Sequence, residues 1–301
     1  MSKYILKEVY SYLYESKKEE KETLSSLFKK SYPNFVSSLT DLTNDPEFME
    51  SLEGDGSNED KLVITTKTVK CSDLIPLQNE IGAKESLDFP LTNKIKKESI
   101  EKMCSTEDCD ANIYDSQGRW IITSGGKYIV DGHHRWSSVF VLNPDCKIQV
   151  KDIGTYKKGV DALKVSQIII AVLSKAKGKI GSKKASGLNI INADQKELKE
   201  YIKKTASIDF IKVYIEANHS KGIRNKESVI NKIFKNCMKL QSQGIDTDAH
   251  DNERGIMPQF DDNGVYLDKA SQGEVKLSDV KSAMKEHKDQ IIRWKHLAGL
   301  K

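Results

Sequence analysis

Short runs of apolar and β-branched residues recur between residues 61 and 155, and their lengths predict strands. The expected strands are Leu62–Ile64, Thr66–Cys71, Asn112–Tyr114, Trp120–Ile122, Tyr128–Val130 and Lys147–Val150. The apolar set at Val139–Leu142 predicts a helix that stops at Asn143 and Pro144. We therefore expect a compact α+β domain over residues 61–155.

Helical spacing of apolar residues is typical of the two ends of the chain. It predicts helices within residues 1–50 and over Asp194–Lys203, Ser228–Leu240 and Leu277–Leu297, with a polar loop at 241–264. Glycine, serine and acidic residues at 51–60 predict a linker. We divide the chain into an N-terminal helical segment with its acidic linker (1–60), the α+β domain (61–155) and a mainly helical, basic C-terminal region (156–301).

The composition is that of a globular protein, with 38% hydrophobic and 31% charged residues in a chain of 301. No apolar run approaches the roughly 20 residues that cross a bilayer, and the N-terminus lacks the apolar core of a secretory signal. We expect a cytoplasmic protein with no membrane partner. Five cysteines are too few for a disulfide framework, so we expect reduced thiols.

The net charge of +4 hides an uneven distribution along the chain. Residues 161–240 hold 17 lysines and arginines against seven acidic residues, a surplus of +10. A lysine-rich loop in this segment predicts contact with the phosphate backbone of DNA, with Lys179, Lys183 and Lys184 as candidate contacts. The interspersed acidic residues equally fit a solvated helical surface.

The strongest chemical signal is the stretch Asp-Gly-His-His-Arg-Trp at 131–136, between a predicted strand and the predicted helix. Glycine at such a turn lets the backbone approach a ligand closely, and the first N–H groups of a helix carry partial positive charge. Two imidazoles and a guanidinium add positive charge in the same turn. The stretch therefore predicts an anion site, with phosphate as the expected anion.

Each polar residue of the stretch has a candidate role. Arg135 can clamp a phosphate with two parallel hydrogen bonds, beside the N–H groups that follow Gly132. His134 or His133 can donate a proton to a leaving oxygen, because imidazole titrates near working pH. Asp131 can orient a histidine or bind Mg²⁺. The alternative without a ligand is a helix capped by Asp131, whose histidines only form internal hydrogen bonds.

The segment Ile129–Arg135 resembles the central signature of the ParB/sulfiredoxin superfamily, in which a strand, a glycine-containing turn and a helix hold nucleotide phosphates. Val69–Glu80 resembles that family's opening strand and loop, and the whole chain is most similar to ParB-domain proteins of tailed bacteriophages. The resemblance implies an α+β fold with a small mixed sheet, ATP or a related nucleotide as ligand, and the host cytoplasm as location. The superfamily includes partition proteins, sulfiredoxins and serine kinases, so the resemblance does not imply one reaction.

Two departures from the superfamily narrow the expected chemistry. Sulfiredoxins have a cysteine where this sequence has His133, so sulfinic-acid reduction is not expected. Partition proteins follow the nucleotide domain with a helix-turn-helix, and residues 161–301 show no such pattern. The sequence therefore argues against chromosome partition.

Two further sites are candidates outside the central stretch. In the kinase branch of the superfamily a glutamate of the early loop is the general base, and the resemblance gives Glu80 that role. The alternative is a solvent-facing loop carboxylate. Gly125, Gly126 and Lys127 precede the strand that leads into the central stretch, and Lys127 can face the phosphates. They do not form a P-loop, and a hairpin turn is the alternative interpretation.

Together these patterns predict a nucleotide-binding enzyme that uses Mg²⁺ for phosphoryl transfer or nucleotide hydrolysis. The catalytic candidates are Glu80, His134 and Asp131, with Asp131 also as metal ligand, and the cofactor-binding candidates are Gly125, Gly126, Lys127, Gly132, His133 and Arg135. The alternatives are a non-catalytic DNA-binding or nucleotide-gated module, an inactive phage structural protein, and a nuclease in which Asp131, His133 and His134 hold a metal.

Overall fold

The computed structural model describes residues 64–78, 80–92, 97–105, 120–156 and 187–243, together with positions 46, 159, 162, 163, 166 and 281. The expected linker at 51–60 lies outside these residues, as do Lys179, Lys183 and Lys184. The helices expected within 1–50 and over 277–297 also lie outside, apart from positions 46 and 281.

Five strands form one mixed sheet. Their bounds are Thr65–Lys70 (β1), Ile75–Pro76 (β2), Ile122–Ser124 (β3), Tyr128–Asp131 (β4) and Lys147–Asp152 (β5). The spatial order is β1-β5-β3-β4-β2, in which β1–β5 and β3–β4 are antiparallel pairs and β5–β3 and β4–β2 are parallel pairs. This sheet and the helices that accompany it confirm the expected α+β class.

The helical elements are η2 (Cys71–Asp73), η3 (Lys84–Asp88), α5 (Phe89–Leu91), α6 (Lys97–Ser105), α7 (His133–Leu142), α9 (Gln195–Thr205), α10 (Ile208–Asn218), η5 (His219–Lys221) and α11 (Lys226–Gln243). Of these, η3 is a π-helical turn that runs directly into α5. The Asp194 side chain accepts hydrogen bonds from two N–H groups at the start of α9. Ser207 does the same for one N–H of α10, so both starts carry a sequence signal.

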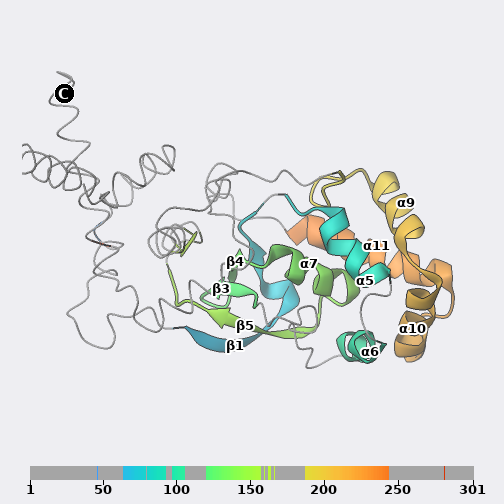
Figure 1. Ribbon diagram of the computed structural model, residues 1–301, viewed down its shortest axis with the longest axis horizontal. Helices are drawn as coiled ribbons and strands as arrows, with labels where there is room; N and C mark the ends of the chain where they lie inside the picture. The colour runs from blue at the N-terminus through green and yellow to red at the C-terminus, as the bar shows by residue number, and fades with distance from the viewer. Residues whose placement is uncertain are drawn as a thin grey trace, which may run out of the picture.

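The core forms around α7, which lies between the sheet and the C-terminal helices (Figure 1). Trp136 and Phe140 of α7 are fully buried and meet edge to face, with ring centroids 5.3 Å apart. The Trp136 indole N–H donates to the Cys71 carbonyl at 2.9 Å. Buried side chains of α9, α10 and α11 belong to the same hydrophobic cluster as those of the sheet. The described parts of the predicted α+β domain and C-terminal region therefore share one core.

Most expected elements within the described residues have a counterpart. β1, β4 and β5 correspond to expected strands, and α7, α9 and α11 correspond to expected helices. α7 gives way to extended backbone at Asn143, as the Asn143-Pro144 signal predicts. β3 begins only at Ile122, where the expected strand ends.

One helix, α10, is not among the expected elements. Phe210 and Tyr214 are buried and Asp209 and Lys212 are exposed, so the helix has a polar face. Ile208, one turn before Lys212, is 71% exposed, and an apolar residue on the exposed face weakens the periodic contrast that identifies a helix in a sequence.

The expected loop at 241–264 begins as the last turn of α11 instead. The Gln241 side-chain amide donates to the Ile190 carbonyl at 2.7 Å, and the Gln243 amide donates to the Ser72 carbonyl at 2.8 Å. Both glutamines therefore anchor the helix end to other segments. Polar residues at these positions suggest a loop when only the sequence is considered. In the structure their side-chain amides form tertiary hydrogen bonds instead.

The cysteines are not all in one state. Cys71 and Cys237 are buried free thiols, as expected, and burial raises the pKa of Cys237 to about 12. Cys146 is disulfide-bonded, which corrects the expectation of reduced thiols. The number of cysteines indicates whether a disulfide framework is possible, but it does not show whether two of them form a single bridge. Among the described residues, no helix combines the length and apolarity needed to cross a bilayer.

Candidate functional site

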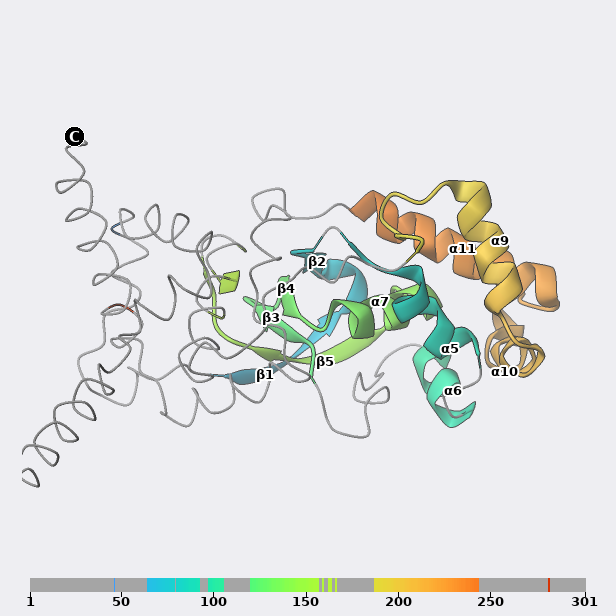
Figure 2. The same ribbon diagram turned by 45° about the horizontal axis from the view of Figure 1, so that its top comes forward.

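Two parallel strands bring the sequence-predicted loops to one edge of the sheet. In the β2–β4 pair, Ile75 lies opposite Tyr128 and Pro76 lies opposite Ile129. The loop after β2 and the turn after β4 therefore leave the sheet at the same edge, where α7 begins (Figure 2). Ligands of sheets with parallel strands commonly bind outside the carboxyl ends of those strands.

His133 joins the two loops. Its side chain is 2% exposed, and its Nε2 accepts a hydrogen bond from the Leu77 N–H at 3.1 Å. Acceptance at Nε2 requires the ring proton on Nδ1, so this arrangement contains a neutral imidazole. The His133 side chain therefore positions the loop after β2 against the first turn of α7.

Gly132 forms the turn between β4 and α7. It is the N-cap residue, with a left-handed φ of 89°. The alternative interpretation expected Asp131 to cap the helix, whereas the N-cap residue is Gly132. A Cβ atom at Gly132 would lie 3.1 Å from Ile121 Cα and 3.1 Å from Arg135 Nη2. Glycine is needed both for the φ angle and for the close packing.

Arg135 braces the same turn. Its Nη2 donates to the Trp120 carbonyl at 2.7 Å and lies 3.6 Å from Asp131 Oδ2. Its Nε is buried and has no hydrogen-bond partner among the described residues. The side chain as a whole is 22% exposed. A guanidinium carries five N–H donors, so these contacts leave donors that can bind an anion.

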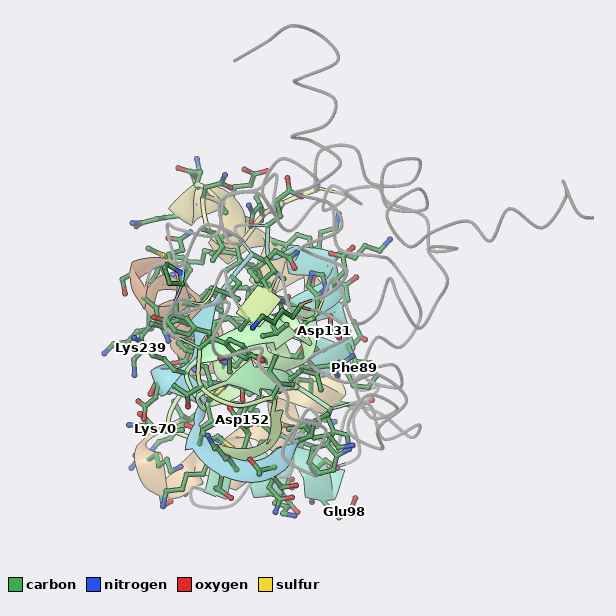
Figure 3. All side chains as sticks on the ribbon, turned by 90° about the vertical axis from the view of Figure 1, so that its left-hand side faces the viewer. Lys70, Phe89, Glu98, Asp131, Asp152 and Lys239 are labelled. Atoms are coloured by element: carbon green, nitrogen blue, oxygen red, sulfur yellow. The ribbon has the colours of Figure 1, made fainter. Side chains whose placement is uncertain are left out.

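The carboxylate of Asp131 lies at the end of β4, with its side chain 18% exposed (Figure 3). The described residues contain no group of three His, Cys, Asp or Glu side chains that could hold a metal ion. The nuclease alternative, with Asp131 and both histidines around one metal, therefore has no support there. A single carboxylate does fit Mg²⁺ of the kind that is held mainly by substrate phosphates and water.

A buried hydroxyl cluster fixes the main chain at His134. The hydroxyls of Ser137 and Ser138 lie 3.1 Å and 2.8 Å from the His134 carbonyl oxygen. Ser137 Oγ is also 2.7 Å from Ser86 Oγ, and Ser138 Oγ is 2.9 Å from the Ser86 carbonyl oxygen. Ser86 belongs to η3, and π-helical turns often occur at functional sites. These contacts hold η3 against the first turn of α7. His134 is half-buried, and its Nε2 is a buried atom.

Glu80 lies in the loop after β2, with its side chain partly buried. The Gln78 side-chain amide donates to the Glu80 carbonyl, and the Ile81 N–H donates to Asn189 Oδ1 at 2.9 Å. Both ends of this short loop are therefore anchored. The loop begins at Leu77, whose N–H is bonded to His133, and Glu80 follows three residues later.

The turn at Gly125, Gly126 and Lys127 uses its N–H groups internally. The Gly125 N–H donates to the Gly154 carbonyl at 2.8 Å, and the Lys127 N–H donates to the Ser124 carbonyl at 3.0 Å. The Lys127 ammonium lies 4.7 Å from the centre of the Tyr128 ring. This geometry matches the hairpin-turn interpretation, and the exposed Lys127 ammonium is the part of the turn that can reach a ligand.

Asp152 organises this turn, although the sequence patterns do not single it out. Its carboxylate is buried and accepts from Lys67 Nζ at 2.7 Å, Thr123 Oγ1 at 2.9 Å, the Gly154 N–H at 3.2 Å and the Gly126 N–H. The alternation along β5 contains the signal, since Ile148 and Val150 are buried and position 152 lies on the same face.

Comparison of the chain with family models, with curated proteins and with solved structures found no match. A functional interpretation therefore depends on the geometry of the α7 start and on the resemblance of residues 129–135.

Proposed function

We propose that this protein binds ATP or a related nucleotide and that the start of α7 holds the phosphates, for Mg²⁺-dependent phosphoryl transfer or hydrolysis. The observation that carries the proposal is the left-handed Gly132 cap, which starts a ten-residue helix beside the ends of two parallel strands. A helix start of this kind presents main-chain N–H groups and partial positive charge to an anion. The resemblance of residues 129–135 to the ParB/sulfiredoxin signature supports a nucleotide as that anion.

Each residue of the site has a proposed part. The main-chain N–H groups after Gly132 and the remaining donors of Arg135 bind phosphate oxygens. His134 is half-buried with its Nε2 inside the protein, and its imidazole is the proposed donor of a proton to the leaving oxygen. His133 acts by position, since its Nε2 is engaged by Leu77. Lys127 adds a positive charge at the periphery.

Asp131 is the residue that would hold Mg²⁺ together with the phosphates. Bound Mg²⁺ would neutralise charge that develops on the phosphoryl oxygens. Asp131 Oδ2 lies 3.6 Å from Arg135 Nη2, so the carboxylate also holds the guanidinium at the turn between β4 and α7. Such a nucleotide-dependent protein belongs in the cytoplasm, which for a phage-encoded chain is that of the host.

Glu80 is the proposed general base that takes the proton of an acceptor hydroxyl or a water molecule. Its anchored loop and its partly buried side chain support this role, because a base must be held at a fixed place relative to the phosphates. Glu80 makes no proposed contact with the nucleotide phosphates. A change at Glu80 should therefore affect turnover of the nucleotide and leave its binding unchanged.

The proposal is tested by incubating the purified full chain with each radiolabelled nucleoside triphosphate, with and without Mg²⁺, and following binding and release or transfer of label. Arg135→Ala should abolish binding, whereas Glu80→Gln should bind normally and lose turnover. Glu85→Gln, an exposed carboxylate on η3, is the matched control and should behave as the parent chain.

Circular dichroism establishes that each variant is folded. Unchanged nucleotide affinity in a folded Arg135→Ala variant would contradict the phosphate site. Binding without turnover in the parent chain would favour the nucleotide-gated module over the enzyme.

A further inference from the structure

A cluster of lysines surrounds a single carboxylate at the far end of α7. Asp145 lies in the turn between α7 and β5, 2.8 Å from Lys70 Nζ of β1 and 3.7 Å from Lys239 Nζ of α11. Lys70 and Lys239 appear on the same side of the molecule in Figure 3, on the opposite side from Asp131. Segments far apart in the sequence thus supply positive charge to one surface.

Three more exposed lysines extend the cluster. Lys232 and Lys235 precede Lys239 by seven and four residues, so all three share one exposed face of α11. Lys147 lies opposite Lys70 in the β1–β5 register. We call the five residues Lys70, Lys147, Lys232, Lys235 and Lys239 the lysine surface.

The lysine surface has an excess of positive charge. Its acidic neighbours are Asp145 and the exposed Asp73, whose charges act on Lys70. The hydrogen bond from Lys70 lowers the pKa of Asp145, and the charges of Lys239 and Lys232 act in the same direction. Asp145 therefore stays ionised and offsets one of the five ammonium charges. With Asp73 counted as well, five lysines against two carboxylates leave a net charge of +3.

The residue types indicate the class of partner. The surface contains lysine without arginine or aromatic side chains, and the exposed large apolar residue of the described chain, Ile208, lies on α10. Protein interfaces are depleted in lysine and enriched in aromatic residues and arginine, and membrane-surface helices need an apolar face. Lysines without apolar neighbours are typical of contacts to nucleic-acid phosphates that are independent of sequence.

We infer that the lysine surface binds the phosphodiester backbone of a nucleic acid, without sequence preference. The surface is separate from the proposed nucleotide site, because α7 has ten residues and spans about 15 Å between them. The inference does not depend on nucleotide binding.

The test measures fluorescence anisotropy of a labelled duplex of mixed sequence, titrated with the full chain between about 50 and about 200 mM salt. Lys232→Gln/Lys235→Gln should weaken binding roughly tenfold and reduce the slope of log affinity against log salt by about 1.8. The matched control Lys204→Gln/Lys212→Gln removes two exposed lysines from α9 and α10 and should leave binding unchanged.

Asp145→Asn gives a prediction of opposite sign. Removal of this carboxylate raises the positive charge of the surface, so the variant should bind the duplex more tightly and with a steeper salt dependence. Neither change is expected if the lysines only support the fold.

Four results would overturn the inference: no binding by the parent chain, equal weakening in the control pair, unchanged affinity in Lys232→Gln/Lys235→Gln, or tighter binding of polyglutamate than of the duplex. The last would identify an acidic protein segment as the partner. Nucleotide binding measured on the same variants should stay at the parent level, which distinguishes this inference from the proposed function.

Discussion

Gly132 combines two constraints at one residue, a left-handed backbone and close contact with its neighbours. Six glycines of the described chain have positive φ, but a Cβ at Gly132 would meet Ile121 Cα at 3.1 Å, whereas nothing lies within 4 Å of such an atom at Gly222. Alanine at Gly132 thus incurs strain and a tight contact with the backbone of Ile121, while alanine at Gly222 incurs strain alone.

Gly132→Ala should therefore destabilise the protein by about 2 to 4 kcal/mol, and Gly222→Ala by about 1 to 2 kcal/mol. Urea denaturation of both variants measures the difference. Equal losses of unfolding free energy in the two variants would mean that the close contacts around Gly132 do not contribute to stability.

Asp152 is a second residue whose partners define its effect. Four donors surround its buried carboxylate, and in Asp152→Asn the amide nitrogen must face at least one of them. We expect a loss of about 2 to 3 kcal/mol in the free energy of unfolding, because a buried donor is left without an acceptor. Asp145→Asn, at an exposed ion pair, should change it by less than about 1 kcal/mol. A small effect at position 152 would contradict a structural role for the carboxylate.

At the scale of elements, the C-terminal helices close the end of α7. The Tyr214 hydroxyl of α10 donates to the Leu142 carbonyl at 2.9 Å, and the Asn236 side-chain amide of α11 donates to the Val141 carbonyl at 2.8 Å. The last carbonyls of a helix lack partners within the helix, so these side chains supply the missing donors. α7 is in this way fixed at its end by α10 and α11 and at its start by η3.

Tyr214→Phe retains the packing of the ring and removes this donor. It should reduce the free energy of unfolding by about 1 to 2 kcal/mol, as expected for a buried carbonyl that loses a partner. Tyr201→Phe, which loses a bond to Asp88 at a partly exposed site, should cost less. Chemical denaturation of the two variants makes the comparison, and a larger loss at Tyr201 would argue against closure of α7 by α10.

The elements also show which sequence signals are informative. The Asp194 cap and the Asn143-Pro144 stop are local signals, and both mark helix ends in the structure. Helix α10 and the last turn of α11 depend on tertiary contacts, namely burial of Tyr214 and the bond from Gln243 to Ser72. Such contacts join residues distant in sequence, so hydrophobic periodicity does not reveal them.

At the scale of the whole molecule, the candidate site depends on the order of the strands. The sequence predicts the stretch at 131–136 and the loop that contains Glu80 as separate motifs. Their meeting results from the parallel pairing of β2 with β4 and from the bond between Leu77 and His133. Strand order is a property of the complete sheet, and a two-residue strand such as β2 leaves little trace in the sequence. The inward position of His133 is therefore a result that only the fold supplies.

The most direct test of the proposed nucleotide site follows main-chain amide resonances of the ¹⁵N-labelled full chain during titration with ATP and Mg²⁺. Saturable shifts are expected at the amides of His133, His134 and Arg135, with little change at Lys232 and Lys235. This pattern would locate the phosphates at the start of α7, where main-chain N–H groups are proposed to bind them. The proposed phosphate site would be contradicted if the resonances of these three amides did not change, or if no resonance of the chain showed a saturable shift.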